Sequence, residues 1–368
     1  MQAVILVGGE GTRLRPLTSQ LPKPVLDVID RPFLAHMLDW LSRHGVDRAI
    51  ISCGFKADAL IERLGTGVVH GVELTYVQEP EPRGTAGALK FAEEYLDERF
   101  LMLNGDVLTD LDLSAQLAAH AATPGATGTL GLVPVADPSA FGLVRTAEDG
   151  TVVGFVEKPK PEEIDTDLIS AGAYVLERSV LDLIPAGENV SIERAVFPLM
   201  VGNGLYGFAH RSAYFMDLGT PERYLDGSRH ILDGSIRTAW HDLCDADGSM
   251  IHAEAEVEGT VIAPSHVGPG AKVAAGAVVG PYAVLGAGVQ LGAGSILTDA
   301  VALPGAEIGE RVRIERGVIG HDARVGDGAS VSGDAIIGPG AELGAEMTLS
   351  NGERIAASEG DAYAAISR

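Results

Sequence analysis

The sequence predicts two domains of different architecture, an α/β domain with a Rossmann-like, mostly parallel sheet and a parallel β-helix after it. Over the first 220 or so residues, short apolar runs alternate with amphipathic helical segments. This alternation is typical of a parallel sheet covered by helices. Beyond residue 250, apolar residues recur at every sixth position. That period fits neither a helix nor an ordinary strand, but it fits the coils of a parallel β-helix.

The α/β pattern starts with the first residues of the chain. We expect strands and helices in the order 4–7 (strand), 32–44 (helix), 49–53 (strand), 57–64 (helix), 74–78 (strand), 84–96 (helix) and 100–103 (strand). Ligands of such sheets bind outside the carboxyl ends of the strands. The glycine-rich loop after the first strand and Asp106 after the fourth both fall at such ends. We therefore expect the loop and Asp106 to share one crevice.

The period of six in the C-terminal part persists through eight positions, slips once and then resumes. The positions that it predicts to face inward are Val261, Val267, Val273, Val279, Leu285, Leu291, Leu297, Leu303, Ile319, Val325, Val331, Ile337, Leu343 and Leu349. At about 18 residues per coil, roughly five coils fit this segment. A connecting helix is expected over residues 222–240. The expected domain organisation is therefore an N-terminal domain over 1–228, a linker over 229–250, the β-helix over 251–350 and a tail over 351–368.

The composition argues against several classes of function. The 368-residue chain is 46% hydrophobic and carries a formal net charge of −24. Nucleic-acid-binding proteins normally present a basic face, so we expect no nucleic acid partner. No apolar stretch reaches membrane-spanning length, so no membrane partner is expected either. Cys53 and Cys244 follow no metal-binding spacing, which favours reduced thiols and a cytoplasmic location.

The loop after the first strand is the most informative motif. It reads GGEGTRLRPLT over residues 8–18, and Lys23 follows between two prolines. Because glycine has no Cβ, the N–H groups of such a loop can approach a ligand closely and form an anion-binding nest. Arg13, Arg15 and Lys23 add positive charge, so the natural ligand is a polyphosphate. Gly-Gly-x-Gly by itself is equally compatible with a tight turn, and the string matches neither the P-loop nor the dinucleotide fingerprint.

The whole string from Gly8 to Val25 resembles the signature of the sugar nucleotidyltransferases, and the C-terminal repeats resemble the left-handed hexapeptide β-helix. This resemblance covers nearly the whole chain and implies that a nucleoside triphosphate and a sugar 1-phosphate form an NDP-sugar and pyrophosphate. The attacking sugar phosphate is already an anion, so the reaction needs no general base. Catalysis then consists of positioning and electrostatic stabilisation.

The resemblance also implies the nucleotide and metal ligands. The expected catalytic residues are Arg13 on the β- and γ-phosphates, Lys23 facing the phosphates, and Asp106 and Asp217 as ligands of Mg²⁺, which prefers such hard oxygens. Asp217 lies in a segment, residues 215–224, that matches the second aspartate motif of the family. Arg15 is either a helper or a salt-bridge partner. The implied nucleotide-binding set is Val7, Gly8, Gly9, Gly11, Thr12, Arg13, Gln78, Gly84, Thr85 and Asp106.

Further motifs resemble those that hold the sugar phosphate. Phe141-Gly142 resembles a loop near the sugar, and Val156-Glu157-Lys158-Pro159 matches a motif whose glutamate binds sugar hydroxyls and whose lysine meets the phosphate. The segment around Gly172, residues 170–174, matches one that closes over the sugar. The implied sugar-phosphate ligands are therefore Gly142, Glu157, Lys158 and Gly172.

Three stretches, residues 84–88, 103–107 and 191–198, resemble the members of the family that transfer a guanylyl group to mannose 1-phosphate. We therefore expect GTP and mannose 1-phosphate as substrates and GDP-mannose as product. A thymidylyl- or uridylyltransferase for glucose 1-phosphate is an alternative, because those enzymes share most of the motifs. Alternatives of another class are a regulatory subunit that binds sugar nucleotides without catalysis, and a hexapeptide acyltransferase. A rigid repeat with open end coils also predicts a homo-oligomer that assembles through the β-helix.

Overall fold

The structure is a computed structural model that describes residues 1–19, 21–54, 56–357 and 364–366. Contacts within the chain divide it into two units, and neither unit is one continuous segment. The first, which we call the α/β unit, consists of Met1–Gly9 and Met37–Phe215. The second, the β-helix unit, consists of Glu10–His36 and Met216–Arg368. The predicted boundaries at residues 228, 250 and 350 rest on a different criterion and stay a prediction.

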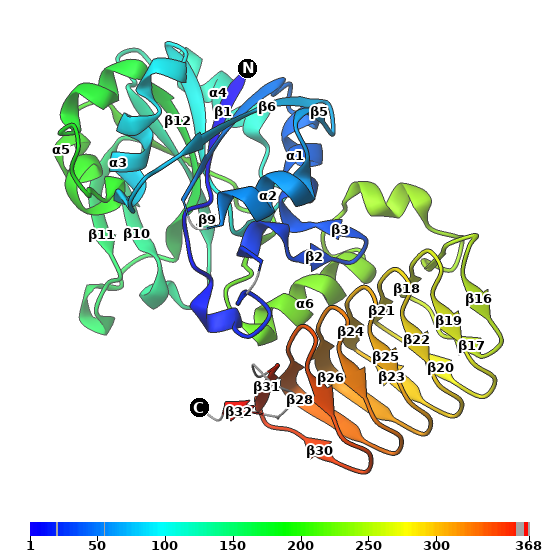
Figure 1. Cartoon of the computed structure of the whole chain (residues 1–368). Coiled ribbons are helices and arrows are strands. Elements are labelled where there is room, and N and C mark those ends of the chain that lie inside the picture. The colour runs from blue at the N-terminus through cyan, green and yellow to red at the C-terminus, as the bar shows by residue number, and fades with distance from the viewer. Residues whose placement is uncertain (20, 55, 358–363, 367–368) are drawn as a thin grey trace. The chain divides into compact units, whose positions relative to one another are not determined.

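The α/β unit is built around one mixed sheet with helices on its faces (Figure 1). Its strands are β1 (Gln2–Leu6), β4 (Arg48–Cys53), β5 (Gly67–Val69), β6 (Val72–Gln78), β7 (Arg99–Asn104), β8 (Val107–Thr109), β9 (Gly128–Pro134), β10 (Gly142–Thr146), β11 (Val152–Glu157), β12 (Leu168–Glu177) and β13 (Leu205–Ala209). Its α-helices are α2 (Ala57–Leu64), α3 (Gly84–Phe91), α4 (Leu113–Ala122) and α5 (Phe197–Met200), while α1 (Phe33–Arg43) and β14 (Phe215–Asp217) contain the divisions between the units.

The sheet order is β11-β10-β12-β7-β1-β4-β6-β5. Strands β7, β1, β4 and β6 are parallel neighbours, as the alternation of strands and helices predicts. Strand β12 pairs antiparallel with β7 and begins an antiparallel half formed with β9, β10 and β11. The predicted α/β sheet is therefore confirmed, with the four strands expected from the sequence as parallel neighbours. A further parallel pair joins β13 to β9. The helix over 57–64 has the predicted bounds, whereas that over 84–96 ends at Phe91 and a 3₁₀ turn follows.

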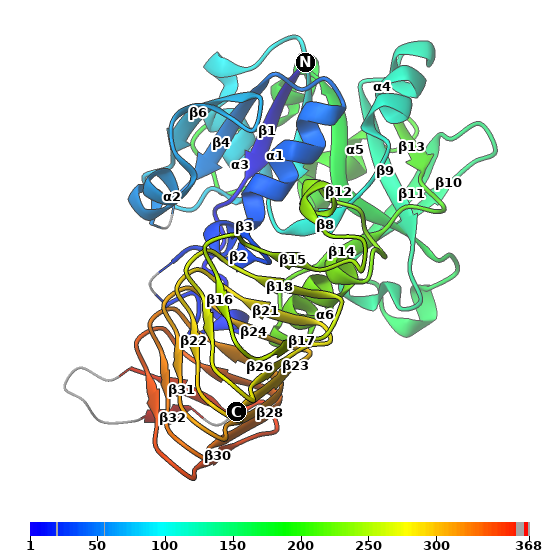
Figure 2. The ribbon, with the colours of Figure 1, turned by 90° about the vertical axis from the view of Figure 1, so that its right-hand side faces the viewer.

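The β-helix unit consists of stacked coils of short parallel strands, which Figures 1 and 2 show in yellow to red. Two strands of the N-terminal insert, β2 (Asp27–Val28) and β3 (Arg31–Pro32), and helix α6 (Pro221–Leu232) belong to the same unit. The coil strands are β15 (Met250–Ile251), β16 (Glu256–Val257), β17 (Thr260–Val261), β18 (Ser265–Val267), β19 (Lys272–Val273), β20 (Val278–Val279), β21 (Ala283–Leu285), β22 (Gln290–Leu291), β23 (Ile296–Thr298), β24 (Ala300–Ala302), β25 (Glu307–Ile308), β26 (Arg313–Ile319), β27 (Arg324–Val325), β28 (Ser330–Ile337), β29 (Glu342–Leu343), β30 (Thr348–Leu349), β31 (Arg354–Ala356) and β32 (Ala364–Ile366).

Strand register explains the slip in the six-residue period. Neighbouring coils are 18 residues apart where the six-residue period holds, as in Val279↔Leu297. Leu285, by contrast, pairs with Ala302, only 17 residues on. Two residues separate Leu297 from Ala300, whereas three separate their partners Val279 and Ala283 in the coil before. Ala302 therefore takes the inward position, and the assignment of that position to Leu303 was wrong. One face is a six-stranded parallel sheet, which gives one coil more than the expected five.

One outer face of the β-helix is also buried. The side chains of Val284, Val301, Val318 and Ile336 alternate with inward-facing residues, yet each is at most 1% exposed. Helix α6 packs against β26 and β28 on this side. The predicted helix over 222–240 is shorter, since α6 ends at Leu232 and a separate 3₁₀ segment covers Ala239–Leu243. Burial of this apolar row is what attaches the flanking segments to the coils.

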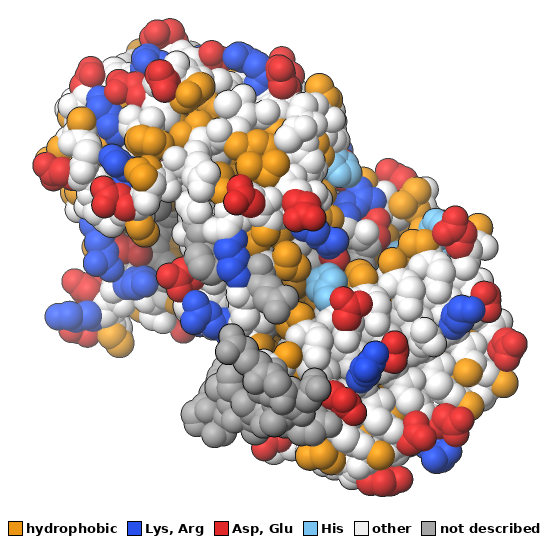
Figure 3. Space-filling model, in the orientation of Figure 1, with side chains coloured by type: hydrophobic (Ala, Val, Ile, Leu, Met, Phe, Trp, Pro, Cys, Tyr) orange, Lys and Arg blue, Asp and Glu red, His pale blue; other side chains and the backbone are white. Residues whose placement is uncertain are grey.

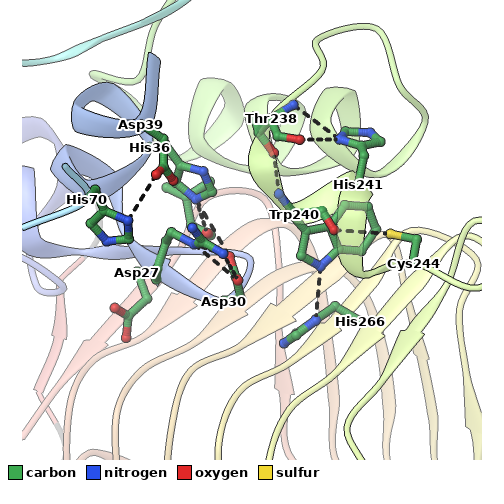
Figure 4. Close-up of polar contacts among 12 residues, drawn as sticks. Asp27, Asp30, His36, Asp39, His70, Thr238, Trp240, His241, Cys244 and His266 are labelled. Atoms are coloured by element: carbon green, nitrogen blue, oxygen red, sulfur yellow. Dashed lines mark hydrogen bonds and ion pairs between the residues drawn. The ribbon is translucent and has the colours of Figure 1, made fainter. Parts of the chain in front are cut away.

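A polar residue begins the same row. Burial lowers the pKa of His266 to about 4, so its ring is neutral at pH 7. The indole nitrogen of Trp240 donates to Nδ1 of His266 at 3.2 Å, as Figure 4 shows. Trp240 is itself fully buried. The 3₁₀ segment therefore docks on the β-helix through a satisfied hydrogen bond as well as through apolar contact.

Candidate active site

The glycine loop starts in the α/β unit, directly after β1. Val7 is buried, and Gly8 and Gly9 are exposed. A Cβ on Gly8 or Gly9 would meet no heavy atom within 4 Å, and neither residue has a positive φ. The fold therefore places no steric or conformational demand for glycine at these two positions. Because Gly8 and Gly9 have no side chains, the space around their backbone N–H groups is open, as an anion site requires.

Asp106 lies beside the start of this loop. Strand β7 is parallel to β1, with Asn104 opposite Leu6. The N–H of Gly105 donates to the carbonyl of Leu6 at 2.9 Å, and a Cβ on Gly105 would lie 2.5 Å from Cγ1 of Val7. Only glycine permits this close approach. The turn that carries Asp106 is thereby held against the first residues of the glycine loop.

The residues expected at the sugar come from the antiparallel half of the sheet. Gly142 on β10 lies opposite Glu157, the last residue of β11. The N–H of Lys158 donates to the carbonyl of Phe141 at 2.9 Å, and the Lys158 side chain is exposed. The structure thus brings Gly142, Glu157 and Lys158 together at one edge of two paired strands. Burial, followed by the nearby carboxylate of Glu193, raises the pKa of Glu157 above its ordinary value.

Gly172 is also joined to the Asp106 turn. It has φ +67° within a break in the register of β12, and a Cβ there would lie 2.7 Å from Nδ2 of Asn104. Asn104 is the residue at the end of β7, two positions before Asp106. A residue expected at the sugar and a residue expected at the metal are therefore connected through a single side chain.

Three members of the expected nucleotide-binding set, Gln78, Gly84 and Thr85, lie away from the glycine loop in the sequence and have a different setting. Gln78 ends β6 with an exposed side chain. The hydroxyl of Thr85 donates to Glu193 at 2.8 Å and accepts from the N–H of Ile192 at 2.8 Å. Gly84 has φ +68°, and a Cβ there would lie 2.6 Å from the carbonyl oxygen of Val190. The residue types at Gly84 and Thr85 are thus explained by packing of α3 against residues 188–193.

Sequence reasoning missed one buried carboxylate in this region. Glu79 follows β6 and is 9% exposed. It accepts from the hydroxyl of Ser52 at 2.9 Å and from the N–H of Arg83 at 3.2 Å. The available signal in the sequence was that Glu79 directly follows Gln78, a member of the expected nucleotide-binding set. Glu79 holds the loop of residues 79–83 against the end of β4.

The second half of the glycine loop belongs to the β-helix unit. Gly11 has φ +60°, and its carbonyl accepts from the hydroxyl of Thr18 at 2.7 Å. A short 3₁₀ helix, Thr12–Leu14, follows and leaves the side chains of Thr12 and Arg13 exposed. Arg15 forms an exposed ion pair with Glu10 at 2.9 Å, which is the salt-bridge alternative for this residue.

Three cations surround Asp217 in the same unit. Nζ of Lys23 lies 3.2 Å from Oδ1 of Asp217, and Nη1 of Arg223 lies 3.0 Å from Oδ2. Nη2 of Arg13 lies 3.8 Å from Oδ2. Gly219 makes room for this cluster, because a Cβ there would lie 2.6 Å from Nη2 of Arg13. One carboxylate among three cations leaves an excess of positive charge, which suits a polyphosphate.

Arg223 was not among the predicted site residues. It lies in the first turn of α6, where its N–H donates to the hydroxyl of the N-cap residue Thr220. Helix geometry turns its side chain back toward the N-terminal end, and there it meets Asp217. The signal in the sequence was an arginine six residues after Asp217, just beyond the proline at which the helix starts.

Carboxylates that could hold a metal occur in both units. Among the described residues, no group of three or more His, Cys, Asp or Glu side chains forms a metal site. Asp106 and Asp217 provide single carboxylates. A single carboxylate of this kind suits a divalent cation such as Mg²⁺, which takes few protein ligands and its other ligands from phosphate and water.

Comparison with known proteins agrees with this arrangement. The nucleotidyl transferase family model matches residues 2–234, well over half of the chain. The chain belongs to the nucleotidyl transferase family. A second model, described as the GMPPB C-terminal domain, matches residues 248–357. The family resemblance seen in the sequence is thereby confirmed, and the chain is an enzyme of the nucleotidyltransferase type.

Individual relatives cover both units. A mannose-1-phosphate guanylyltransferase of Mycobacterium tuberculosis is 39% identical over 284 residues, which are 74% of this chain and 78% of the relative. A mannose-1-phosphate guanyltransferase of Debaryomyces hansenii is 36% identical over 340 residues, 90% of each chain. Among solved structures, HddC from Yersinia pseudotuberculosis is 30% identical with a TM-score of 0.55, over 62% of this chain and 99% of that one. In the part of the chain that the structure describes, no helix is long and apolar enough to cross a membrane.

Proposed function

We propose that this nucleotidyltransferase transfers a guanylyl group from GTP to mannose 1-phosphate and releases pyrophosphate and GDP-mannose. The observation that carries the proposal is the cluster of Arg13, Lys23 and Arg223 around Asp217. Two polyanions must meet for this reaction, and their charge is the main obstacle. Cations that are already in place reduce the repulsion between the two anionic substrates, and no proton transfer is needed.

In this mechanism, the phosphates of the nucleotide bind the three cations that contact Asp217 in this structure, which are Arg13, Lys23 and Arg223. Arg13 reaches the β- and γ-phosphates and stabilises the leaving pyrophosphate, and Lys23 lies on the phosphates being separated. Lys23 is suited to a fixed position because its side chain is only 9% exposed. The N–H groups of Gly8, Gly9, Gly11 and Thr12 add donors to the phosphate oxygens. The N–H of Val7 instead donates to the carbonyl of Ser52 at 2.9 Å, so Val7 contributes to the site by holding the start of the loop on the sheet. Arg223 supplies the third cation.

A divalent ion, which we propose to be Mg²⁺, would be held by Asp106 and Asp217. Such an ion would neutralise part of the charge on the triphosphate. Asp217 is released for this role when Lys23 and Arg223 turn to the phosphates. Each of the two carboxylates is positioned by its own unit, Asp106 by the turn after β7 and Asp217 at the end of β14, shortly before α6.

The acceptor and the base would be held by residues of the α/β unit. Glu157 accepts hydrogen bonds from sugar hydroxyls, and Lys158 binds the sugar phosphate. Gly142 and Gly172 contribute backbone groups, because the space beside their Cα atoms is occupied by Phe155 and Asn104. Gln78 reads the base together with backbone groups of Gly84 and Thr85, because the Thr85 hydroxyl already has two partners. GTP and mannose 1-phosphate are favoured by the names of the relatives in Mycobacterium tuberculosis and Debaryomyces hansenii.

The test is a matrix of nucleoside triphosphates against sugar 1-phosphates, with pyrophosphate release as the readout. We expect the highest kcat/KM with GTP and mannose 1-phosphate in the presence of Mg²⁺, and loss of turnover when the metal is chelated. Highest turnover with dTTP or UTP and glucose 1-phosphate would overturn the guanylyl assignment. Turnover unchanged by EDTA would overturn the metal assignment.

A homo-oligomer formed through the β-helix and a cytoplasmic location stay predictions. The first coil contains β15, β16 and β17. Within the described part of the chain, each of these strands pairs with a strand of the next coil and with no other strand. Ile251, Val257 and Ile262 in this coil are 41%, 37% and 43% exposed. An open coil end with apolar side chains is a surface that a second subunit can cover. Light scattering of the purified protein measures the subunit number directly.

A further inference from the structure

The last coil of the β-helix makes a direct contact with the glycine loop inside the β-helix unit. Nη1 of Arg354, on β31, donates to the carbonyl of Arg13 at 2.8 Å and to the carbonyl of Arg15 at 2.7 Å. These residues are more than 330 positions apart in the sequence. Hydrogen bonds from a charged donor are stronger than bonds between neutral groups. One guanidinium thus holds two backbone groups of the loop on which the proposed phosphate ligand Arg13 lies.

Two further contacts follow the same edge of the stack. The backbone of Gly338, one coil before, lies against Pro16, since a Cβ on Gly338 would come within 2.6 Å of Cγ of Pro16. In the coil before that, Nε2 of His321 lies 3.2 Å from Oδ2 of Asp27. Three successive coils therefore contact the insert Glu10–His36. Arg354 is the contact at the residue with the proposed catalytic role.

The contacts of Arg354 differ from those of two exposed arginines on preceding coils. Arg311 pairs with Glu310 at 2.9 Å and Arg324 with Glu307 at 3.3 Å, and both arginine side chains are more than 60% exposed. Acidic and basic side chains of this kind are interspersed over the β-helix surface in Figure 3. Such exposed pairs contribute little to stability. Arg354 is directed at backbone carbonyls of a loop, an arrangement that fixes chain position.

We propose that Arg354 is a positioning residue for nucleotidyl transfer, through which the β-helix holds the backbone of Arg13 while the Arg13 side chain stays available to the phosphates. The side chain of Arg13 is 63% exposed although its carbonyl is bound. The loop contains only a three-residue 3₁₀ helix. The hydrogen bonds within so short a helix fix the position of the Arg13 backbone only weakly. This inference rests on the proposed role of Arg13. It adds a catalytic purpose to the β-helix beyond assembly.

The test compares Arg354→Ala with Arg324→Ala, a matched control that removes an arginine from a neighbouring coil strand without touching the loop. For Arg354→Ala we expect KM for GTP to rise about tenfold, since displacement of a phosphate ligand by even 1 Å is costly. KM for mannose 1-phosphate should change less than twofold. Arg354→Lys, which retains a cationic donor on a shorter arm, should recover part of the loss. Arg324→Ala should match the wild type.

A second measurement, independent of activity, reports the stability of the loop structure over residues 11–18. In Arg354→Ala, amide hydrogen exchange over residues 11–18 should be at least several-fold faster, and trypsin should cleave after Arg13 sooner, while exchange in β4 and β7 is unchanged. If Arg354→Ala fails to fold, Gly338→Ala provides a second displacement of the loop through Pro16 and should raise KM for GTP in the same direction.

The two proposals fail in different ways. Wild-type exchange over residues 11–18 in Arg354→Ala would overturn the positioning role whatever the enzyme catalyses. Faster exchange with an unchanged KM for every nucleotide would also overturn it, since the loop would then move without consequence. Faster exchange with a raised KM for a nucleotide other than GTP would retain the positioning role and overturn the guanylyl assignment.

Discussion

The two units present their functional groups in opposite ways. The α/β unit uses the ends of strands: Asp106 follows β7, Glu157 ends β11, and Gly8 and Gly9 follow β1. The β-helix unit uses short segments outside its coils for the cluster around Asp217. Arg13 and Lys23 lie in three-residue 3₁₀ helices, Asp217 ends the short strand β14, and Arg223 lies in the first turn of α6. Strand ends are placed by the pairing of a whole sheet, so they require no further support. A three-residue 3₁₀ helix has little internal order, and the loop that carries Arg13 is held by Arg354 of the last coil.

This difference also explains why the division of the chain cuts through the glycine loop, between Gly9 and Glu10. The first part of the loop continues a strand of the sheet, with Val7 still bonded to Ser52 of β4. The second part is bonded to Arg354 of the β-helix. A motif that is continuous in sequence is thus supported by two different structural units. We expect substitutions in the two parts to affect different properties of the enzyme.

The largest effect is expected from the two proposed metal ligands, one in each unit. Asp106→Asn and Asp217→Asn should each lower kcat by about 10²–10³-fold, because each removes a charge from the proposed metal site. Pyrophosphate release measures the rate. Asp97→Asn and Asp242→Asn are matched controls, since both aspartates form exposed ion pairs, with Arg48 and Arg237. A variant at either site position with wild-type activity would remove that residue from the metal site.

A smaller effect is expected from two glycine substitutions, one of which should weaken GTP binding and the other the stability of the fold. Gly9→Ala adds a Cβ in open space, so its melting temperature should match the wild type while KM for GTP rises about tenfold. Gly84→Ala adds a Cβ at φ +68° and 2.6 Å from a carbonyl oxygen, so it should lose about 1–3 kcal/mol of unfolding free energy. Calorimetry and steady-state kinetics on both variants give the comparison. A destabilised Gly9→Ala would mean that the loop needs glycine for the fold alone.

The smallest effect is a pH dependence confined to the α/β unit. Burial and the carboxylate of Glu193 raise the pKa of Glu157, so Glu157 takes up its proton at a higher pH than an ordinary glutamate does. A protonated carboxyl accepts fewer hydrogen bonds from sugar hydroxyls. KM for mannose 1-phosphate should therefore rise, by a factor of about 2–5, as pH falls from 7 to 5.

The control for this dependence is Glu157→Gln, which carries no titrating group at that position. The substrate phosphate titrates in both proteins, so the ratio of the two KM values isolates the contribution of the side chain. A ratio that does not change with pH would show that ionisation of Glu157 plays no part in sugar binding. KM for GTP should follow the same pH profile in both proteins.

Much of this molecule was readable from local sequence patterns. The alternation of strands and helices predicted the α/β sheet, and the period of six predicted the β-helix, because each pattern repeats the geometry of one structural unit. The motifs around Asp106 and Asp217 also identified the family, since they lie in short continuous strings. The slip of the period was visible too, but the residue that fills the inward position, Ala302 and not Leu303, followed only from the register of the stacked coils.

What only the tertiary structure decided depends on contacts between residues far apart in the sequence. The partnership of Arg354 with the glycine loop, the assignment of Glu10–His36 to the β-helix unit, and the buried outer row of Val284, Val301, Val318 and Ile336 have no local signature. An apolar residue at an outward position predicts only that something covers it. Which segment does so is settled by packing in three dimensions, because shape and burial are properties of the folded chain and not of any short string within it.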